Sequence, residues 1–217
     1  GAEEESAHKS DCYSEVHGLS PLSKMCKYFT HCEIFGCRSP MQPSKLIDQR
    51  YSVVSRLGEG RMGEVYCVTD TNAELVPYAL KSLKDDTLSG SFIEEFRLLR
   101  SLGHPAFVFA HTLGFDAEEN SLYMVLELVE GVSLEEYEGS VDAGELCLTL
   151  LSALDHLHRH GLVHGDVAPA NIIASERGFR ILDLGAAGPI GSGEGTTSGV
   201  LAYTAPERLR GAAKEIA

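Results

Sequence analysis

The sequence predicts an α+β fold in two parts: an antiparallel sheet of five strands with one helix inserted after the third strand, and then a mainly helical part. Three observations support this prediction. Hydrophobic residues make up 43% of the 217 residues, enough to bury a full core. Short apolar segments bounded by turn residues follow one another over residues 51–129. Apolar residues then recur at helical spacing over residues 143–160.

Residues 1–50 lack this hydrophobic periodicity, so we expect a separate N-terminal segment that ends in a linker at Pro40 and Pro43. The segment carries enough soft ligands for one tetrahedral Zn²⁺ site. These candidate ligands are Cys12, His17, Cys26, His31, Cys32 and Cys37. No two of the cysteines form a CxxC pair, so free thiols in a loose leader are at least as well supported as zinc.

Two predicted strands, residues 51–57 and 64–68, flank a glycine-rich turn that runs from Gly58 through Gly60 to Gly63. Glycines in a tight hairpin are common, so the turn alone is a weak signal. Because a strand rather than a helix follows it, these glycines would arch over a nucleotide from above and would not form a Rossmann phosphate site.

A third strand is expected to end at Lys81, which occupies a period-two position among apolar neighbours. A lysine in such a position is a candidate for binding phosphate. The next apolar residues have helical spacing over residues 91–102, with Ser91 and Glu94 three residues apart as a capping box. Either Glu94 or Glu95 of this helix would face Lys81.

Two further strands, residues 107–115 and 121–129, precede a polar connection over residues 131–144. The second helix is expected over residues 143–160. Its leucines at helical spacing are predicted to be buried: Leu146, Leu150, Leu151, Leu154 and Leu157.

An acid and an amide stand close together in the loop after this helix. Asp166 and Asn171 are five residues apart in the run HGDVAPAN, and Asp183 closes a short apolar strand further on. Two carboxylates and one amide suit hydrated Mg²⁺ and a phosphate group. An isolated acid in such a loop is more often a turn former or a helix cap, so the interpretation depends on the residues upstream.

The chain has 32 acidic and 18 basic residues, and its net charge of −14 repels a phosphate backbone. We therefore expect no nucleic-acid partner. No apolar run reaches the length of a bilayer span, and the acidic N-terminus is unlike a signal peptide. We expect no membrane association within this chain and a cytoplasmic location, where the six cysteines would be thiols or metal ligands.

Taken in order, these elements resemble the protein kinases from Tyr51 to Ala217, as a serine/threonine-type catalytic domain in a bacterial-like variant with HGD in place of HRD. The motifs that support the resemblance are the glycine loop Gly58 to Gly63 with Val65, the strand YALK, a glutamate before HP, the linker LVEG, HGD with its asparagine, DLG, and Ala205-Pro206-Glu207. The resemblance implies a two-lobe fold, with a sheet lobe over residues 51–128 and a partial helical lobe over residues 129–217.

The resemblance also implies ATP and Mg²⁺ as cofactors, and transfer of phosphate to a serine or threonine of a protein substrate. Lys81 would hold the α- and β-phosphates and pair with Glu95. Asp166 would orient the attacking hydroxyl, while Asn171 and Asp183 would bind Mg²⁺.

Eleven positions would contact the nucleotide by this resemblance: Leu57, Gly58, Gly60, Gly63, Val65, Ala79, Lys81, Leu126, Glu127, Val129 and Ile173. Leu126 would line the back of the adenine pocket, and the backbone of Glu127 and Val129 would hydrogen-bond the base. The side chains of Val65, Ala79 and Ile173 would sandwich the adenine ring.

The chain departs from the family pattern around the catalytic aspartate. Gly165 replaces the arginine that precedes it, which removes the usual cation for a phosphate on residues 196–198. We therefore expect phosphorylation there not to control activity. Ala168 and Val200 replace a lysine and a threonine whose side chains meet at that aspartate in the family.

The chain also ends ten residues after Glu207, before the helices that form most of the family's large lobe. We expect either a fragment or a minimal kinase, in which a partner or a missing segment covers the face from Leu146 to Leu157. Two alternative functions stay open. A pseudokinase would use the fold as a nucleotide-binding or scaffolding module, and a small-molecule kinase would share the HGD form but generally lack the glycine-loop form and the APE element.

Overall fold

The computed structural model describes residues 45–60, 62–73, 76–191 and 201–203. Three sets of predicted features lie outside these residues: the zinc-ligand candidates from Cys12 to Cys37; the phosphorylation candidates Thr196, Thr197 and Ser198; and Val200 with the APE element at Ala205, Pro206 and Glu207. The inferences drawn from all three sets stay predictions.

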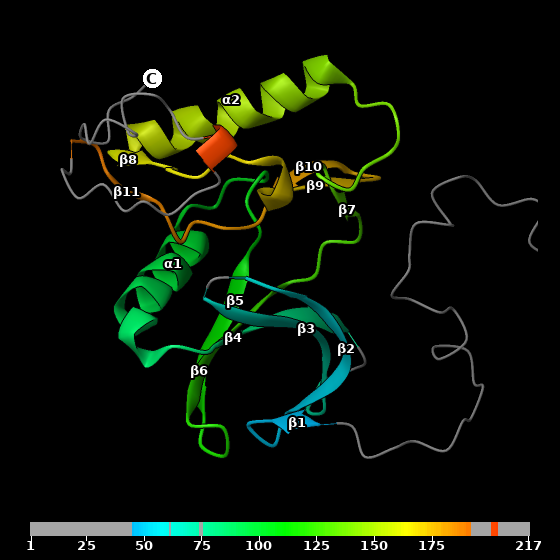
Figure 1. Ribbon diagram of the computed structural model, residues 1–217, viewed down its shortest axis with the longest axis vertical. Coiled ribbons are helices and arrows are strands. Elements are labelled where there is room, and N and C mark those ends of the chain that lie inside the picture. The colour runs from blue at the N-terminus through cyan, green and yellow to red at the C-terminus, as the bar shows by residue number, and fades with distance from the viewer. Residues whose placement is uncertain (1–44, 61, 74–75, 192–200, 204–217) are drawn as a thin grey trace, which may run out of the picture. The chain divides into compact units, whose positions relative to one another are not determined.

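Antiparallel pairing builds a six-stranded sheet in the described chain, with the order β1-β2-β3-β4-β6-β5 (Figure 1). The strands are Leu46–Ile47 (β1), Tyr51–Glu59 (β2), Gly63–Asp70 (β3), Pro77–Leu83 (β4), Ala110–Asp116 (β5) and Ser121–Glu127 (β6). All five predicted strands are present. β1 is an addition to the prediction, because a two-residue strand is too short to show polar and apolar alternation.

Helix α1 (Ser89–Ser101) connects β4 to β5 and lies beside the curled sheet (Figure 1). The predicted capping box of Ser91 and Glu94 is wrong, since the helix starts two residues before Ser91. Its N-cap residue, Leu88, makes no side-chain hydrogen bond. A 3₁₀ turn capped by Asp85 leads into the helix and supplies the start signal instead.

The second part of the described chain contains helix α2 (Ala143–Arg159) and two small sheets beside it (Figure 1). One has the order β10-β9-β7, and the other pairs β11 with β8. The remaining elements are β7 (Val132–Ser133), β8 (Leu162–Val163), β9 (Ile172–Ser175), β10 (Gly178–Ile181), β11 (Gly188–Pro189) and the 3₁₀ turns η3 (Asp86–Leu88), η4 (Pro169–Asn171) and η5 (Leu201–Tyr203). Within the described ranges, no helix is both long and apolar enough to cross a membrane.

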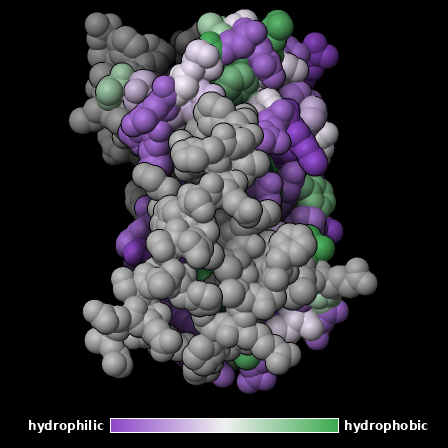
Figure 2. All heavy atoms as spheres, turned by 90° about the vertical axis from the view of Figure 1, so that its right-hand side faces the viewer, coloured by the Kyte–Doolittle hydropathy of each residue, from purple (hydrophilic) through white to green (hydrophobic). Residues whose placement is uncertain are grey.

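Two clusters of buried side chains hold the described residues together. The larger one joins Phe92 and Leu99 of α1 and Met124 of β6 to Ala153 and Leu157 of α2. The smaller one lies on the other face of the sheet, as the alternation along β4 requires: Ile47, Tyr51, Val68, Leu80, Tyr123 and Val125. On the face drawn in Figure 2, the described surface is mostly hydrophilic, with hydrophobic side chains in small groups.

Four of the five predicted core leucines of α2 are buried or half-buried. The prediction is wrong for Leu151, whose exposed fraction is 64%, and its neighbour Leu148 is 72% exposed. The apolar stripe of α2 is thus wider than the surface that the described strands and loops offer to cover it.

Residues 106–108 join the two parts of the described chain. The prediction placed Phe107 at the start of a strand, but β5 begins three residues later. The backbone N–H of Val108 instead donates to the Ile181 carbonyl at 3.2 Å, and the N–H of Ile181 donates to the Ala106 carbonyl at 2.7 Å. The end of β10 is thereby bonded to the segment between α1 and β5.

At Gly63, β3 approaches β4 too closely for any side chain. A Cβ atom there would lie 1.7 Å from the carbonyl oxygen of Ser82. Packing alone is therefore a sufficient reason for glycine at this position.

We expect Gly63→Ala to lower the free energy of unfolding by about 1–3 kcal/mol, because extra atoms are forced into a packed site. The control is Gly90→Ala in α1, where a Cβ would meet no atom within 4 Å. That change should leave stability unchanged or slightly raised, since alanine favours helix. Urea unfolding of both variants measures the difference, and equal stability would contradict the close approach.

Candidate active site

A buried ion pair joins Lys81 of β4 to Glu95 of α1. The Nζ atom of Lys81 lies 2.7 Å from Oε1 and 2.8 Å from Oε2 of Glu95. Glu95 is 1% exposed and Lys81 is 9% exposed. Glu95, not Glu94, faces Lys81, because Glu94 lies on the exposed side of the helix and pairs there with Arg97.

Asp183 adds a second carboxylate to this pair. Its Oδ2 atom lies 3.6 Å from Lys81 Nζ, and its Oδ1 atom accepts the backbone N–H of Gly185 at 2.6 Å. Burial opposes ionisation of Asp183, but the charge of Lys81 and the hydrogen bond from Gly185 hold the pKa of Asp183 below its ordinary value. Asp183 is therefore an anion at neutral pH.

The three charges do not balance one another. Burial disfavours the charged form of Lys81, but Glu95 and Asp183 outweigh it and raise the pKa of Lys81. Burial, aided by the charge of Asp183, raises the pKa of Glu95. One cation thus serves two carboxylates, and the ionised Asp183, whose side chain is 42% exposed, is the one open to an added metal cation.

Asp166 and Asn171 meet in the loop between β8 and β9. The side-chain nitrogen of Asn171 donates to the backbone oxygen and to Oδ2 of Asp166, at 3.1 Å in each case. The backbone N–H of Leu182 donates to the Asn171 carbonyl at 3.0 Å, which ties this loop to the residue before Asp183. Both amide protons of Asn171 serve Asp166, so its carbonyl Oδ1 is the atom suited to a metal.

His164 supports the loop from inside the protein and carries no role in the sequence prediction. It is 2% exposed, and its Nδ1 accepts the backbone N–H of Asp166 at 3.3 Å. Burial lowers the pKa of His164, so the ring is neutral at physiological pH. The position of His164 directly after the apolar Val163 could have indicated that its side chain is buried and supports the loop.

The register of the sheet places four predicted nucleotide contacts on one face. Val65 is the cross-strand partner of Lys81, and Ala79 is the partner of Leu126. Because cross-strand partners and alternate residues share a face, these side chains lie on the same side as Lys81. Val65 and Ala79 are half-buried and Leu126 is buried.

The other predicted adenine contacts lie around this face in different ways. Leu57 sits at a register shift between Arg56 and Gly58, where a β-bulge re-aims the side chain. Ile173 of β9 packs against the backbone just after the linker, since a Cβ at Gly131 would lie 2.5 Å from its Cγ2. Each of these positions keeps its nucleotide role as a prediction.

The structure narrows the predicted base contact of Glu127 to one backbone group, and the contact itself stays a prediction. The backbone N–H of Glu127 donates to the Phe109 carbonyl at 2.8 Å, so this amide is not the group that meets a base. Its carboxylate pairs with Arg180 of β10 at 2.5 Å, and Arg180 also donates to the Phe107 carbonyl at 3.0 Å. Arg180 has no role in the sequence prediction. A charged residue between the apolar Phe179 and Ile181 is nevertheless typical of a residue that has an ion-pair partner.

The first two glycines of the loop have no packing reason to be glycine. A Cβ at Gly58 or Gly60 would meet no atom within 4 Å, in contrast to Gly63. The turn is closed by the N–H of Gly60, which donates to the Gly63 carbonyl at 2.8 Å. Bare backbone with open space beside it suits a loop that approaches phosphates.

The residues present fit ATP and Mg²⁺. Asp183 and Asn171 offer a carboxylate and an amide oxygen, the hard ligands that Mg²⁺ takes together with substrate phosphates. Lys81 supplies a buried cation for those phosphates, and Gly58 and Gly60 supply open backbone. No group of three His, Cys, Asp or Glu side chains that could hold a metal ion is present among the described residues.

Residues 51–216 match the protein kinase domain family. This chain belongs to that family. The curved sheet lobe and the lobe built around α2 are accordingly the two lobes of a kinase fold, and the buried charges lie where the lobes meet. The predicted α+β, two-lobe fold class is confirmed.

Several relatives named as serine/threonine-protein kinases are similar to this kinase domain. The probable serine/threonine-protein kinase PknB of Lactococcus lactis is 30% identical over 188 residues, 79% of this chain and 30% of the relative. PrkC of Bacillus subtilis is 33% identical over 183 residues, 77% of this chain and 28% of the relative. SBK2 of Rattus norvegicus is 33% identical over 171 residues, 74% of this chain and 47% of the relative. The chain spans less than half the length of each.

The two departures from the kinase pattern at Gly165 and Ala168 lie in tightly packed surroundings. Gly165 has a φ of +82°, and a Cβ there would lie 2.4 Å from the carbonyl oxygen of Ala186. Ala168 is 2% exposed. The local structure itself therefore favours glycine at position 165, because the positive φ and the nearby Ala186 carbonyl both oppose a side chain.

We expect Gly165→Ala to destabilise the kinase domain more than Gly161→Ala does. Both glycines have positive φ, +82° and +73°, and alanine in that region costs about 1–2 kcal/mol. A Cβ at Gly161 meets no atom within 4 Å, so that variant measures the backbone cost alone. Thermal and urea unfolding measure the stability of both variants. An equal loss of stability would mean that the segment at Ala186 shifts to make room for the Cβ atom at no cost.

Proposed function

We propose that this kinase domain binds ATP with Mg²⁺ and transfers the γ-phosphoryl group to a serine or threonine hydroxyl of a protein. One observation supports this above the others: Lys81 lies between the carboxylates of Glu95 and Asp183, beside the Asp166–Asn171 pair. A scaffold without nucleotide chemistry has no need of a buried lysine that serves one buried and one exposed carboxylate, because burying charge costs stability.

Each residue of the cluster has one part in the proposed reaction. Asp166 accepts the proton of the attacking hydroxyl, whose oxygen forms a bond to the γ-phosphorus as the bond to the β–γ bridging oxygen breaks. Lys81 neutralises charge on the phosphates, and Glu95 fixes its position. Asn171 and Asp183 hold Mg²⁺, which supplies charge neutralisation on the β- and γ-phosphates when bound.

The nucleotide is proposed to lie on the sheet face shared by Val65, Ala79 and Leu126. Gly58 and Gly60 cover its phosphates, and Ile173 closes the adenine from the other lobe. The Glu127 carbonyl and the backbone of Val129 bond the base. Leu57, at the bulge, covers the adenine from above.

The proposal also includes the partners of the kinase domain and its location in the cell. A protein substrate follows from the similarity to relatives named as serine/threonine-protein kinases. The exposed Leu148 and Leu151 indicate a partner or a further segment that covers α2. ATP is held inside the cell, so we propose a cytoplasmic location. A zinc site among the first 50 residues stays a prediction.

The test is phosphate transfer from labelled ATP to a generic basic protein and to the chain itself. We expect transfer by the native chain, and loss of at least about a thousandfold in Asp166→Ala, in line with the loss of positioning and proton acceptance. Lys81→Met should abolish transfer, because the cation that meets the phosphates is lost. Nucleotide binding without transfer in the native chain would favour a pseudokinase, and transfer to small alcohols alone would favour a small-molecule kinase.

We expect Asp183→Asn to remove most of the Mg²⁺ dependence of ATP binding, because one carboxylate ligand is lost. Calorimetry with ATP, in the presence of Mg²⁺ and after its removal by chelation, measures the effect. Asp155→Asn, on the exposed side of α2, serves as the control, since Asp155 pairs only with Arg159 among the described contacts. Unchanged Mg²⁺-dependent affinity in Asp183→Asn would count against this metal ligand.

A further inference from the structure

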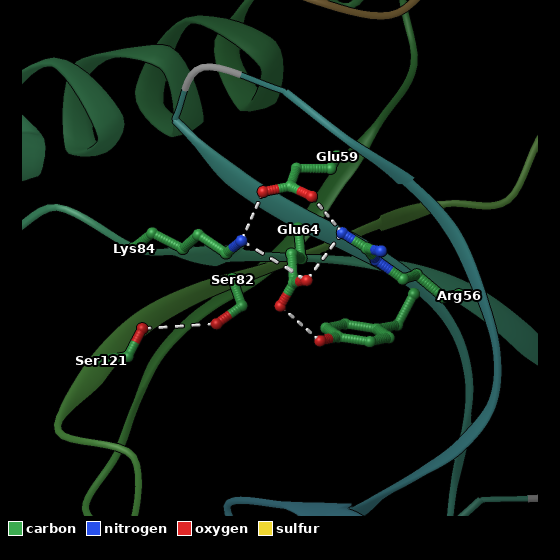
Figure 3. Close-up of polar contacts among 7 residues, drawn as sticks. Arg56, Glu59, Glu64, Ser82, Lys84 and Ser121 are labelled. Carbon is green, nitrogen blue, oxygen red and sulfur yellow. Dashed lines mark hydrogen bonds and ion pairs between the residues drawn. The ribbon is translucent and has the colours of Figure 1, made fainter.

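Four charged side chains form a closed ring at the base of the glycine loop, here named the charge ring: Arg56, Glu59, Glu64 and Lys84 (Figure 3). Arg56 pairs with Glu59 and, at 2.7 Å, with Glu64. Lys84 pairs with the same two carboxylates, at 2.5 Å to Glu59 and 3.5 Å to Glu64. Each cation therefore bridges both carboxylates, and Figure 3 shows the cations on opposite sides of them.

The register of the hairpin explains why these carboxylates need cations. Glu59 and Glu64 are direct cross-strand partners, and like charges in that arrangement repel. Lys84 and Arg56 hold the pKa of the Glu59 carboxyl below its usual range, so it stays ionised at neutral pH. The Tyr66 hydroxyl donates to Glu64 at 2.7 Å and favours the ionised form there too. The strand pairing places the two anions side by side, and the bridging cations offset their repulsion.

Lys84 is connected to the tip of the loop as well as to its arms. Its backbone N–H donates to the Met62 carbonyl at 3.0 Å. Met62 is buried, and its Cε lies 2.9 Å from the place that a Cβ would take at Gly185. Lys84 also follows Lys81 by three residues along the chain. One residue therefore connects the loop to the strand of Lys81 and, through Met62, to the segment that carries Asp183.

The charge ring acts on the loop more than on the fold. Arg56, Glu59 and Lys84 are about half-exposed and Glu64 is 26% exposed, and ion pairs so open to solvent add little to overall stability. The sheet beneath has its own buried cluster around Tyr51, Leu80 and Tyr123. The first half of the loop has almost no packing, since Gly58, Glu59 and Gly60 are all exposed.

We propose that Arg56 and Lys84 are positioning residues that hold the glycine loop over the phosphates of the nucleotide. The inference rests on the proposed function, because ATP is the ligand that the loop would cover. When one bridge is lost, Glu59 and Glu64 repel each other and repel an incoming polyanion. The loop then opens and nucleotide affinity falls, while the chemistry at Asp166 is unchanged.

The experiment compares Lys84→Met with Lys84→Arg and Lys45→Met in the full chain. Lys45 is the matched control, since its side chain is 48% exposed like that of Lys84 and it pairs with Glu119 at 3.0 Å. Its Nζ lies 6.0 Å from the centre of the Tyr66 ring, but it forms no ion pair with the charge ring among the described contacts. We expect Lys84→Met to raise the Kd of Mg·ATP and the KM for ATP about tenfold, with kcat within about twofold. Lys84→Arg should restore the affinity, and Lys45→Met should leave it unchanged.

A second variant separates charge from packing. In the Lys84→Met background, Glu59→Gln removes the repulsion and should recover most of the lost affinity. Amide exchange at Gly60 in the nucleotide-free chain should be faster in Lys84→Met and slower again in the double variant. Recovery of affinity with Glu59→Gln supports the charge ring, whereas equal losses in Lys84→Met and Lys45→Met overturn it.

The outcomes also distinguish this inference from the proposed function. A native chain that binds no Mg·ATP overturns the proposed function and, with it, this role of the charge ring. A native chain that binds Mg·ATP beside a Lys84→Met variant with the same Kd overturns the charge ring alone. Lower kcat with unchanged KM in Lys84→Met would likewise overturn it, because the loss would then lie in the chemical step.

Discussion

The ion pair between Lys81 and Glu95 is the constraint on which the rest of the structure depends. A buried lysine keeps its charge only beside a carboxylate, so α1 must hold Glu95 against β4. Phe92 and Leu99 of α1 are buried in the same cluster as Met124 of β6, and they fix the helix at that distance. The position of α1 is therefore set by apolar packing and by charge together.

The same cluster extends into the second lobe. Ala153 and Leu157 of α2 and Leu184 after Asp183 are buried in it, and residues 106–108 are bonded to β10. Arg180 adds an ion pair to Glu127 across the same boundary. The lobes thus share one core, and Asp183 lies two residues beyond the end of β10, a strand that is bonded to β9 and to residues 106–108.

Residue patterns predicted the fold class, all five longer strands and both long helices. The nucleotide face was predictable too, because the alternation along β4 places Ala79 and Lys81 together. What could not be predicted depends on contacts far apart in sequence. The β5 start shifted because Phe107 bonds to β10, Leu151 is exposed because nothing described covers it, and α1 begins early because a 3₁₀ turn rather than Ser91 starts it.

The candidate site, too, could be predicted from the sequence only in part. Motif order indicated Lys81, Glu95, Asp166, Asn171 and Asp183, but no motif indicates Arg180 or the buried support from His164. These two side chains act through partners 53 residues away or through the local backbone, and only coordinates bring such partners together.

The backbone at Gly165 bears on how this kinase domain can change over evolutionary time. An arginine at this position needs a negative φ and a free space that the Ala186 carbonyl now fills. A side chain at position 165 would therefore force the segment at Ala186 to shift. Evolution towards an arginine here would have to change the packing of that segment as well as residue 165.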